Sequence, residues 1–129
     1  MIEVPVSWGE LVDKITILQI KSDRMHDEAK LANVRKELTL LTGKLGGNAD
    51  VAEIKTLTSA LYNVNAELWD IEDDIRECEN AGDFGEKFVL LARSVYITND
   101  KRSELKREVN SALGSGLVEE KSYQKYKIQ

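Results

Sequence analysis

Residues 54–78 read IKTLTSALYNVNAELWDIEDDIREC, and the apolar residues in this stretch are spaced as on one face of a helix. Eight of them recur at unbroken intervals of three and four: Ile54, Leu57, Leu61, Val64, Leu68, Ile71, Ile75 and Cys78. A strand would place these side chains on alternating faces, whereas a helix gathers them into one stripe. The stripe is roughly 36 Å long, so the helix needs partners of similar length to cover it. This stretch therefore predicts a protein of long helices that lie side by side.

The first predicted helical rod begins at Ser7, because Ser7-Trp8-Gly9-Glu10 fits a capping box. In that motif the serine oxygen accepts a backbone N–H and the glutamate reaches back. The apolar residues that follow lie nearly all round the helix: Leu11, Val12, Ile15, Ile17, Leu18 and Ile20. Such a pattern is typical of a central helix with neighbours on several sides. A strand over residues 15–20 is a rival interpretation, since isoleucine favours β structure.

The apolar pattern of the first rod loses phase near residues 26–29. It resumes as Leu31, Val34, Leu38, Leu41 and Leu45. Because Asp27 can cap a new helix, the first rod is either kinked or split there. Gly46-Gly47-Asn48 then marks its end.

The second rod runs from about Asp50 to Asn80, and Gly82-Asp83 turns the chain, with Asp83 as the expected cap of the third rod. The third rod carries its own stripe and stops at Gly114-Ser115-Gly116. The stripe consists of Phe84, Phe88, Leu91, Val95, Thr98, Arg102, Leu105, Val109 and Ala112.

The two ends of the chain lack this periodicity. Met1–Val6 holds the only proline and is predicted to be an extended arm. Leu117–Gln129 is a tail whose Tyr123, Tyr126 and Ile128 can dock on the helices. We therefore predict a single all-α domain over residues 1–129, an antiparallel bundle of three long helices with coiled-coil-like seams.

The composition limits the classes of function. Lys and Arg number 18 against 23 Asp and Glu, a net charge of −5, which disfavours binding of duplex nucleic acid. No apolar run is long enough to span a bilayer, and no signal peptide is recognisable at the N-terminus, so we expect a cytoplasmic protein. The single cysteine, Cys78, falls on the apolar stripe and is interpreted as a small buried hydrophobe.

Two residues of the third stripe, Thr98 and Arg102, are polar where apolar residues are expected. If the first and third rods run parallel, Thr98 lies at the height of Ser22, another polar interruption, and the second rod brings Asn65 to the same level. We therefore predict a polar layer halfway along the bundle. Its candidate ligand-binding residues are Gln19, Ser22, Asp23, Asn65, Glu67, Thr98, Asn99 and Arg102.

An arginine on a core stripe is costly to bury without a carboxylate partner, and Asp23, Glu67 or Glu72 is the expected one. Two interpretations of Arg102 stay open. It can belong to a small-molecule or anion pocket between helices, or it can form a register-setting ion pair or extend its head to the surface.

Charge is unevenly distributed along the rods. Between Glu67 and Glu86 there are nine acidic residues and one basic residue, Arg76. Within that segment, Glu67, Asp70 and Asp74 lie on one helix face and are candidate ligands of Mg²⁺, although a solvated face is the competing interpretation. A basic group of Lys101, Arg102, Lys106 and Arg107 is expected to pair with this acidic face, within the protein or between copies.

Five segments carry a resemblance to a known family: PVSWGELVDKITILQIKS, KLANVRKEL, ELWDIEDDIRE, ARSVYITNDKRSELKREVN and SGLVEEKSY. Together they resemble a family of small uncharacterised bacterial and phage proteins over nearly the whole chain. The resemblance implies a mostly helical protein and no particular activity. A fainter likeness, over Leu11–Arg24, is to the leucine-rich first helix of the all-helical chorismate mutases, but the paired acidic positions of that motif are absent.

No complete catalytic set accompanies these features, because the lone His26 has no second histidine, cysteine or triad partner near it. The leading hypothesis is a non-enzymatic interaction module that associates with itself or with another protein through helix faces. The alternative is a small enzyme or ligand-binding bundle that acts on phosphorylated metabolites or nucleotides at the polar layer.

Overall fold

The computed structural model describes residues 1–116 and 119–128, and its regular structure is helical. Four α-helices follow one another: α1 (Trp8–Arg24), α2 (Glu28–Leu45), α3 (Ala52–Ala81) and α4 (Glu86–Leu113), with a 3-10 helix, η1 (Gly46–Asp50), before α3. No strand occurs in the described ranges. The all-α class is confirmed, and the rival strand over residues 15–20 is excluded because α1 covers them.

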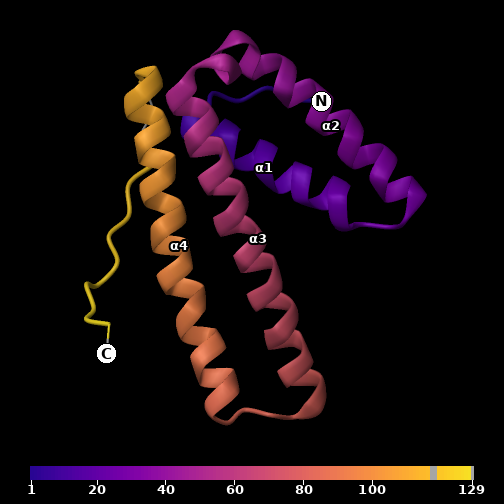
Figure 1. Ribbon diagram of the computed structural model, residues 1–129, viewed down its shortest axis with the longest axis vertical. Coiled ribbons are helices and arrows are strands. Elements are labelled where there is room, and N and C mark those ends of the chain that lie inside the picture. The colour runs from indigo at the N-terminus through magenta and orange to yellow at the C-terminus, as the bar shows by residue number, and fades with distance from the viewer. Residues whose placement is uncertain (117–118, 129) are drawn as a thin grey trace.

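Two helical hairpins make up the molecule (Figure 1). α3 and α4 form the long hairpin, and α1 with α2 forms a shorter arm against its upper part. α1 is central, since it packs against all three other α-helices, as its all-round apolar pattern predicts. The lower parts of α3 and α4 project beyond the arm.

The predicted count of three long helices is corrected to four, because the first rod is split rather than kinked. α1 ends at Arg24, and Met25 adopts an extended backbone (φ −80°, ψ 149°). Asp27 then caps α2, since its carboxylate accepts the Lys30 N–H at 2.9 Å. The chain reverses at this break, and α2 returns alongside α1 (Figure 1).

The break after Arg24 adds a chain reversal, so α1 and α4 run in opposite directions. The assumption that the first and third rods are parallel is therefore wrong. The Trp8 N–H donates to Ser115 Oγ at 2.9 Å, and the Gly9 N–H donates to Asn110 Oδ1 at 2.7 Å. These bonds join the start of α1 to the end of α4. Three alternating rods would make the first and last parallel, whereas four alternating helices make them antiparallel.

Local chemistry fixes most of the helix ends. The Ser7 Oγ accepts the Glu10 N–H at 3.1 Å, which confirms the predicted start of the first helix. α2 ends at Leu45, and Gly46 follows with a φ of 57°, a left-handed conformation that suits glycine. The predicted glycine stop is therefore confirmed.

The turn between α3 and α4 differs from its prediction. Gly82 ends α3 with a φ of 65°, and the Asp83 N–H donates to the Cys78 carbonyl at 2.9 Å, a Schellman-type closure. The Asp83 carboxylate accepts the Gly85 N–H at 3.1 Å, and α4 begins at Glu86. Asp83 is therefore not the cap of α4, because its backbone is used to close α3.

The hydrophobic core lies where the arm meets the long hairpin. Its buried members are Leu11, Val12, Ile15, Leu45, Ile54, Leu57, Leu61 and Val109. On α3, five of the eight stripe residues are buried and the other three are half-buried, and Cys78 is one of the buried five. On α4 the stripe is buried or half-buried from Phe88 onward, whereas Phe84 precedes the helix and is 55% exposed. Across the described residues, no helix combines the length and apolar character needed to cross a bilayer.

Only one of the three predicted tail contacts forms. The Tyr126 hydroxyl donates to the Asp100 carboxylate, and the Tyr126 ring lies 5.0 Å from the Tyr96 ring, centroid to centroid. Tyr123 and Ile128 are 76% and 71% exposed, so the expectation that they dock is wrong. Residues 117, 118 and 129 of the predicted tail lie outside the described residues.

Replacing Gly9 with alanine tests the close approach of α1 to α4. A Cβ at Gly9 would lie 2.3 Å from the Lys106 carbonyl oxygen, a backbone atom that cannot turn aside. We expect Gly9→Ala to lower the free energy of unfolding by about 1–3 kcal/mol in urea denaturation. Gly43 of α2 is the matched control, since nothing lies within 4 Å of its Cβ position. Gly43→Ala should instead raise stability by about 0.5–1 kcal/mol, and equal effects of the two substitutions would contradict the packing described.

Candidate functional site

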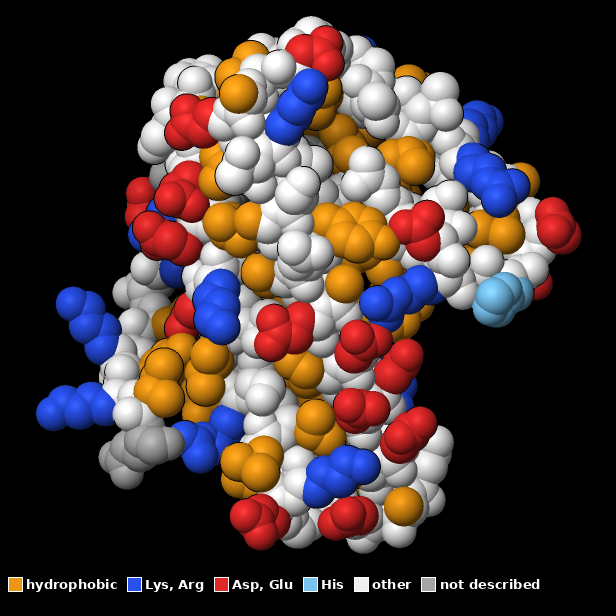
Figure 2. Space-filling model, in the orientation of Figure 1, with side chains coloured by type: hydrophobic (Ala, Val, Ile, Leu, Met, Phe, Trp, Pro, Cys, Tyr) orange, Lys and Arg blue, Asp and Glu red, His pale blue; other side chains and the backbone are white. Residues whose placement is uncertain are grey.

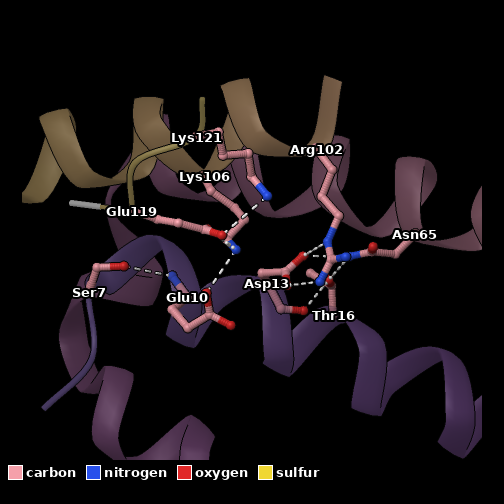
Figure 3. A network of polar contacts seen from close by, with 9 residues as sticks. All are labelled: Ser7, Glu10, Asp13, Thr16, Asn65, Arg102, Lys106, Glu119 and Lys121. Atoms are coloured by element: carbon pink, nitrogen blue, oxygen red, sulfur yellow. Dashed lines mark hydrogen bonds and ion pairs between the residues drawn. The ribbon is translucent and has the colours of Figure 1, made fainter. Parts of the chain in front are cut away.

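A carboxylate lies inside the helix packing: Asp13 of α1 is 1% exposed. Arg102 of α4 binds it through two hydrogen bonds, Nε to Oδ1 at 2.8 Å and Nη2 to Oδ2 at 2.5 Å (Figure 3). The fork of the guanidinium matches the two carboxylate oxygens, which is the strong form of an ion pair. Hydrogen bonding to Asp13 raises the pKa of the Arg102 guanidinium, so Arg102 stays charged at every ordinary pH.

Asn65 of α3 joins this pair to a third helix. Its amide nitrogen donates to Asp13 Oδ1 and to Thr16 Oγ1, both at 2.9 Å, and the Thr16 hydroxyl donates to the Asp13 carbonyl at 2.7 Å. Among the described residues, no buried side-chain nitrogen or oxygen lacks a partner. We call Asp13, Thr16, Asn65 and Arg102 the Asp13 network; it fastens α1, α3 and α4 together at one level.

A second cluster of charges surrounds Lys106, one turn further along α4 (Figure 3). The Lys106 ammonium lies 2.8 Å from the carboxylates of Glu10 and Glu119, and Lys121 lies 3.3 Å from Glu119. Burial by itself lowers the pKa of Lys106, but the two carboxylates outweigh burial and the pKa is raised. The hydrogen bond from Lys106 lowers the pKa of the Glu119 carboxyl. The cluster therefore holds the C-terminal segment against the seam between α1 and α4.

These contacts correct two predictions. Asp13, rather than Asp23, Glu67 or Glu72, is the partner of Arg102. Within the chain, Arg102 and Lys106 pair with α1, and Lys106 also with Glu119, rather than with the acidic face of α3; pairing between copies stays a prediction. The reason is the antiparallel course of α1, which turns the first half of that helix, and not its second half, toward this part of α4.

Asp13 is not among the predicted site residues, although a pattern in the sequence indicates that it is buried. Gly9, Asp13, Thr16 and Ile20 follow one another at spacings of four, three and four, and all are buried. They form a second inward-facing stripe on α1, in which Gly9, Asp13 and Thr16 are small or polar, and a buried aspartate there requires a cation from another helix.

An open groove lies beside the Asp13 network, where the C-terminal half of α1 adjoins α3 and α4. Its volume is about 430 Å³, within the range of ligand and side-chain binding sites. It is lined by Ile17 and Ile20 of α1, by Asn65, Leu68, Trp69, Glu72, Asp73 and Arg76 of α3, and by Asn99 and Arg102 of α4. Asn65 and Arg102 belong to both the network and the groove wall.

Three of the eight predicted polar-layer residues come together in this groove: Asn65, Asn99 and Arg102. The other five do not line it: Gln19, Ser22, Asp23, Glu67 and Thr98. Thr98 is 2% exposed within the helix packing, and the exposed Asp23 accepts the Tyr62 hydroxyl at 2.7 Å. Binding of a ligand by any of the eight stays a prediction.

The candidate magnesium ligands Glu67, Asp70 and Asp74 form no converging set. The Asp70 carboxylate is bound by the Arg24 guanidinium at 2.6 Å. In the part of the chain that the structure describes, no three His, Cys, Asp or Glu side chains are grouped to hold a metal ion. Magnesium binding at these residues stays a prediction. The groove is lined by apolar, amide and charged side chains, and its lining includes no nucleophile paired with a base.

Comparison with known proteins places the chain in one family. A model of the DUF6165 family, described as a family of unknown function, matches residues 2–128. No curated protein and no solved structure matches the chain. The match covers nearly the whole chain, like the resemblance to a family of uncharacterised proteins noted from the sequence. The family description names no activity.

Replacing Arg102 tests how much the protein is destabilised when the buried Asp13 carboxylate loses its cation. We expect Arg102→Leu to lower the free energy of unfolding by about 3–5 kcal/mol, because it leaves the carboxylate unpaired in the core. The double variant Asp13→Leu/Arg102→Leu should recover most of that loss, since neither charge remains. Urea denaturation of the two variants provides the measurement, and a double variant less stable than the single one would show that the pair does not act as a unit.

Docking of the C-terminal segment should depend on acid pH through Glu119. Because the folded pKa of Glu119 is lowered from 4.5, its contribution is complete above about pH 4.5 and is lost as the pH falls through the lowered value. An NMR titration of the Glu119 carboxyl should show this lowered pKa. Lys106→Met should return it toward the ordinary value, and an unchanged titration in that variant would remove Lys106 as the cause.

Proposed function

We propose that this chain, which belongs to the DUF6165 family, is a non-enzymatic interaction module that docks a partner protein in the groove beside the Asp13 network. The observation that carries the proposal is the groove itself, in which the half-buried Ile17, Leu68 and Trp69 lie beside amide and charged side chains. Trp69 and Leu68 are half-buried there, so a partner side chain can cover them without any rearrangement of the core.

The helices that form the groove are firmly placed relative to one another. α1 is fixed to α3 and α4 by the Asp13 network, and Arg24 at the end of α1 binds Asp70 of α3 at 2.6 Å. The Arg24 guanidinium also lies 5.9 Å from the centre of the Trp69 ring. A groove held at both ends is pre-organised, which lowers the entropic cost of binding.

A nucleotide or phosphorylated metabolite is the competing occupant, and its volume would suit the groove. Two features favour a protein over a phosphate. The Arg102 Nε and Nη2 atoms are already bound by Asp13, and a phosphate would meet the carboxylates of Glu72 and Asp73 on the same wall. A thermal-shift titration with ATP should therefore leave the melting temperature unchanged.

Site-specific photo-crosslinking tests the proposal in cells that produce the protein. With p-benzoylphenylalanine in place of Trp69, illumination should give a discrete adduct whose partner is identified by mass spectrometry. The same amino acid in place of the exposed Thr39 of α2 is the control and should give none. No adduct at the first position, or the same adduct at both, would contradict docking in the groove.

The identified partner should then bind the purified protein through the groove. Leu68 and Leu40 are both partly exposed leucines, and only Leu68 lines the groove. Leu68→Ser should weaken binding by about tenfold or more in calorimetry, because it removes an apolar contact, while Leu40→Ser should leave it unchanged. Equal effects would place the interface elsewhere, and circular dichroism checks that both variants are folded.

A further inference from the structure

The groove is elongated along α3, and its proportions point to a row of side chains as its occupant. The residues of α3 that line it run from Asn65 to Arg76, which corresponds to roughly 16 Å along a helix axis. The groove holds about 430 Å³ and is open to solvent, so the side chains of one face of a helix about 10–12 Å wide can lie in it.

The lining of the groove consists of four apolar side chains, two amides, two carboxylates and two arginines. Ile17, Ile20, Leu68 and Trp69 supply the apolar surface. Both arginines of the lining are already paired, Arg102 with Asp13 and Arg76 with Glu72 at 3.3 Å. This leaves the carboxylate of Asp73 to face an incoming partner.

The α3 wall of the groove belongs to an acidic segment, although Asp70 and Glu72 of that segment pair with Arg24 and Arg76. Nine acidic residues and one basic residue lie between Glu67 and Glu86, and Figure 2 shows acidic side chains gathered over the lower part of α3. Such a surface attracts a positively charged partner over a distance and repels a negative one. It also disfavours binding of α3 from a second copy in the groove, because the acidic faces of the two α3 helices would then meet.

We propose that the occupant of the groove is a basic amphipathic helix of a partner protein. Its apolar residues at i, i+3, i+4 and i+7 fill the trough against Leu68 and Trp69, and its lysines or arginines flank the trough and pair with Asp73 and the neighbouring α3 carboxylates. This inference rests on the proposed function and adds to it the chemistry of the partner.

Synthetic helices of about 18 residues, long enough to be helical in water, provide the probes. One has leucine at the four anchor spacings, lysine at the positions that flank them and alanine elsewhere; the second has glutamate in place of lysine; the third is a scrambled sequence with the composition of the first. In a Trp8→Phe background, Trp69 is the only tryptophan and its fluorescence reports on the groove directly. The leucine–lysine helix should change Trp69 fluorescence at concentrations at least about tenfold lower than either of the others.

Matched charge variants separate groove binding from general attraction. Glu72→Gln/Asp73→Asn neutralises two carboxylates of the groove, and Glu104→Gln/Glu108→Gln neutralises two exposed carboxylates of α4 outside it. Both doubles change the net charge equally. We expect the groove double to weaken binding of the leucine–lysine helix about tenfold, and the α4 double to weaken it by less than about twofold.

Three results would overturn the inference: equal affinity for the lysine and glutamate helices, equal losses in the two double variants, or binding that leaves Trp69 fluorescence unchanged. A photo-adduct of twice the monomer mass would also overturn it, since the occupant would then be a second copy. If position 69 crosslinks to a partner but the lysine helix shows no preference, the partner chemistry is wrong and the interaction module stands. If position 69 gives no adduct at all, the interaction module fails as well.

Discussion

The buried carboxylate of Asp13 is the constraint on which the rest of the arrangement depends. A charge removed from water has to be paired, and here the cation comes from α4 and the amide from α3. Both partners come from other helices, so satisfying Asp13 fixes where α1 sits on the long hairpin and which of its faces turns inward. One turn earlier, Gly9 sets the distance between α1 and α4, because a Cβ there would lie 2.3 Å from the Lys106 carbonyl oxygen. Gly9 and Asp13 thus set how close α1 lies to α4 and which of its faces turns inward.

Arg102 connects this constraint to the candidate site. Its guanidinium binds Asp13 on one side, while its side chain is 28% exposed and lines the groove on the other. A side chain of the groove wall is thereby held in place by the packing of three helices. Because Asn65 and Arg102 belong to both the Asp13 network and the groove lining, a substitution in the network is expected to change the groove wall.

Local patterns in the sequence predict the helices well, and they predict long-range pairing poorly. The stripe from Ile54 to Cys78 gives α3 nearly to its ends, and Ser7 and Asp27 mark helix starts through bonds within one turn. The partner of Asp13 lies 89 residues away, and its identity depends on whether α1 and α4 run parallel. That direction depends on one reversal at the break after Arg24. An error of one helix in the count therefore changed every contact predicted between the first and last helices, while leaving the helices themselves nearly unchanged.

The groove can be traced to the same geometry. The first half of α1 is attached to α3 and α4 by Asp13 and by core packing. Arg24, the last residue of α1, pairs with Asp70 of α3. Between these two attachments the half-buried Ile17 and the buried Ile20 of α1 form one wall of the groove. Two helices in continuous contact along this length would have buried Trp69 completely. A helix attached at two levels of a long hairpin leaves a groove between the attachments, so the contacts that hold the fold together also form the surface on which the proposed partner would dock.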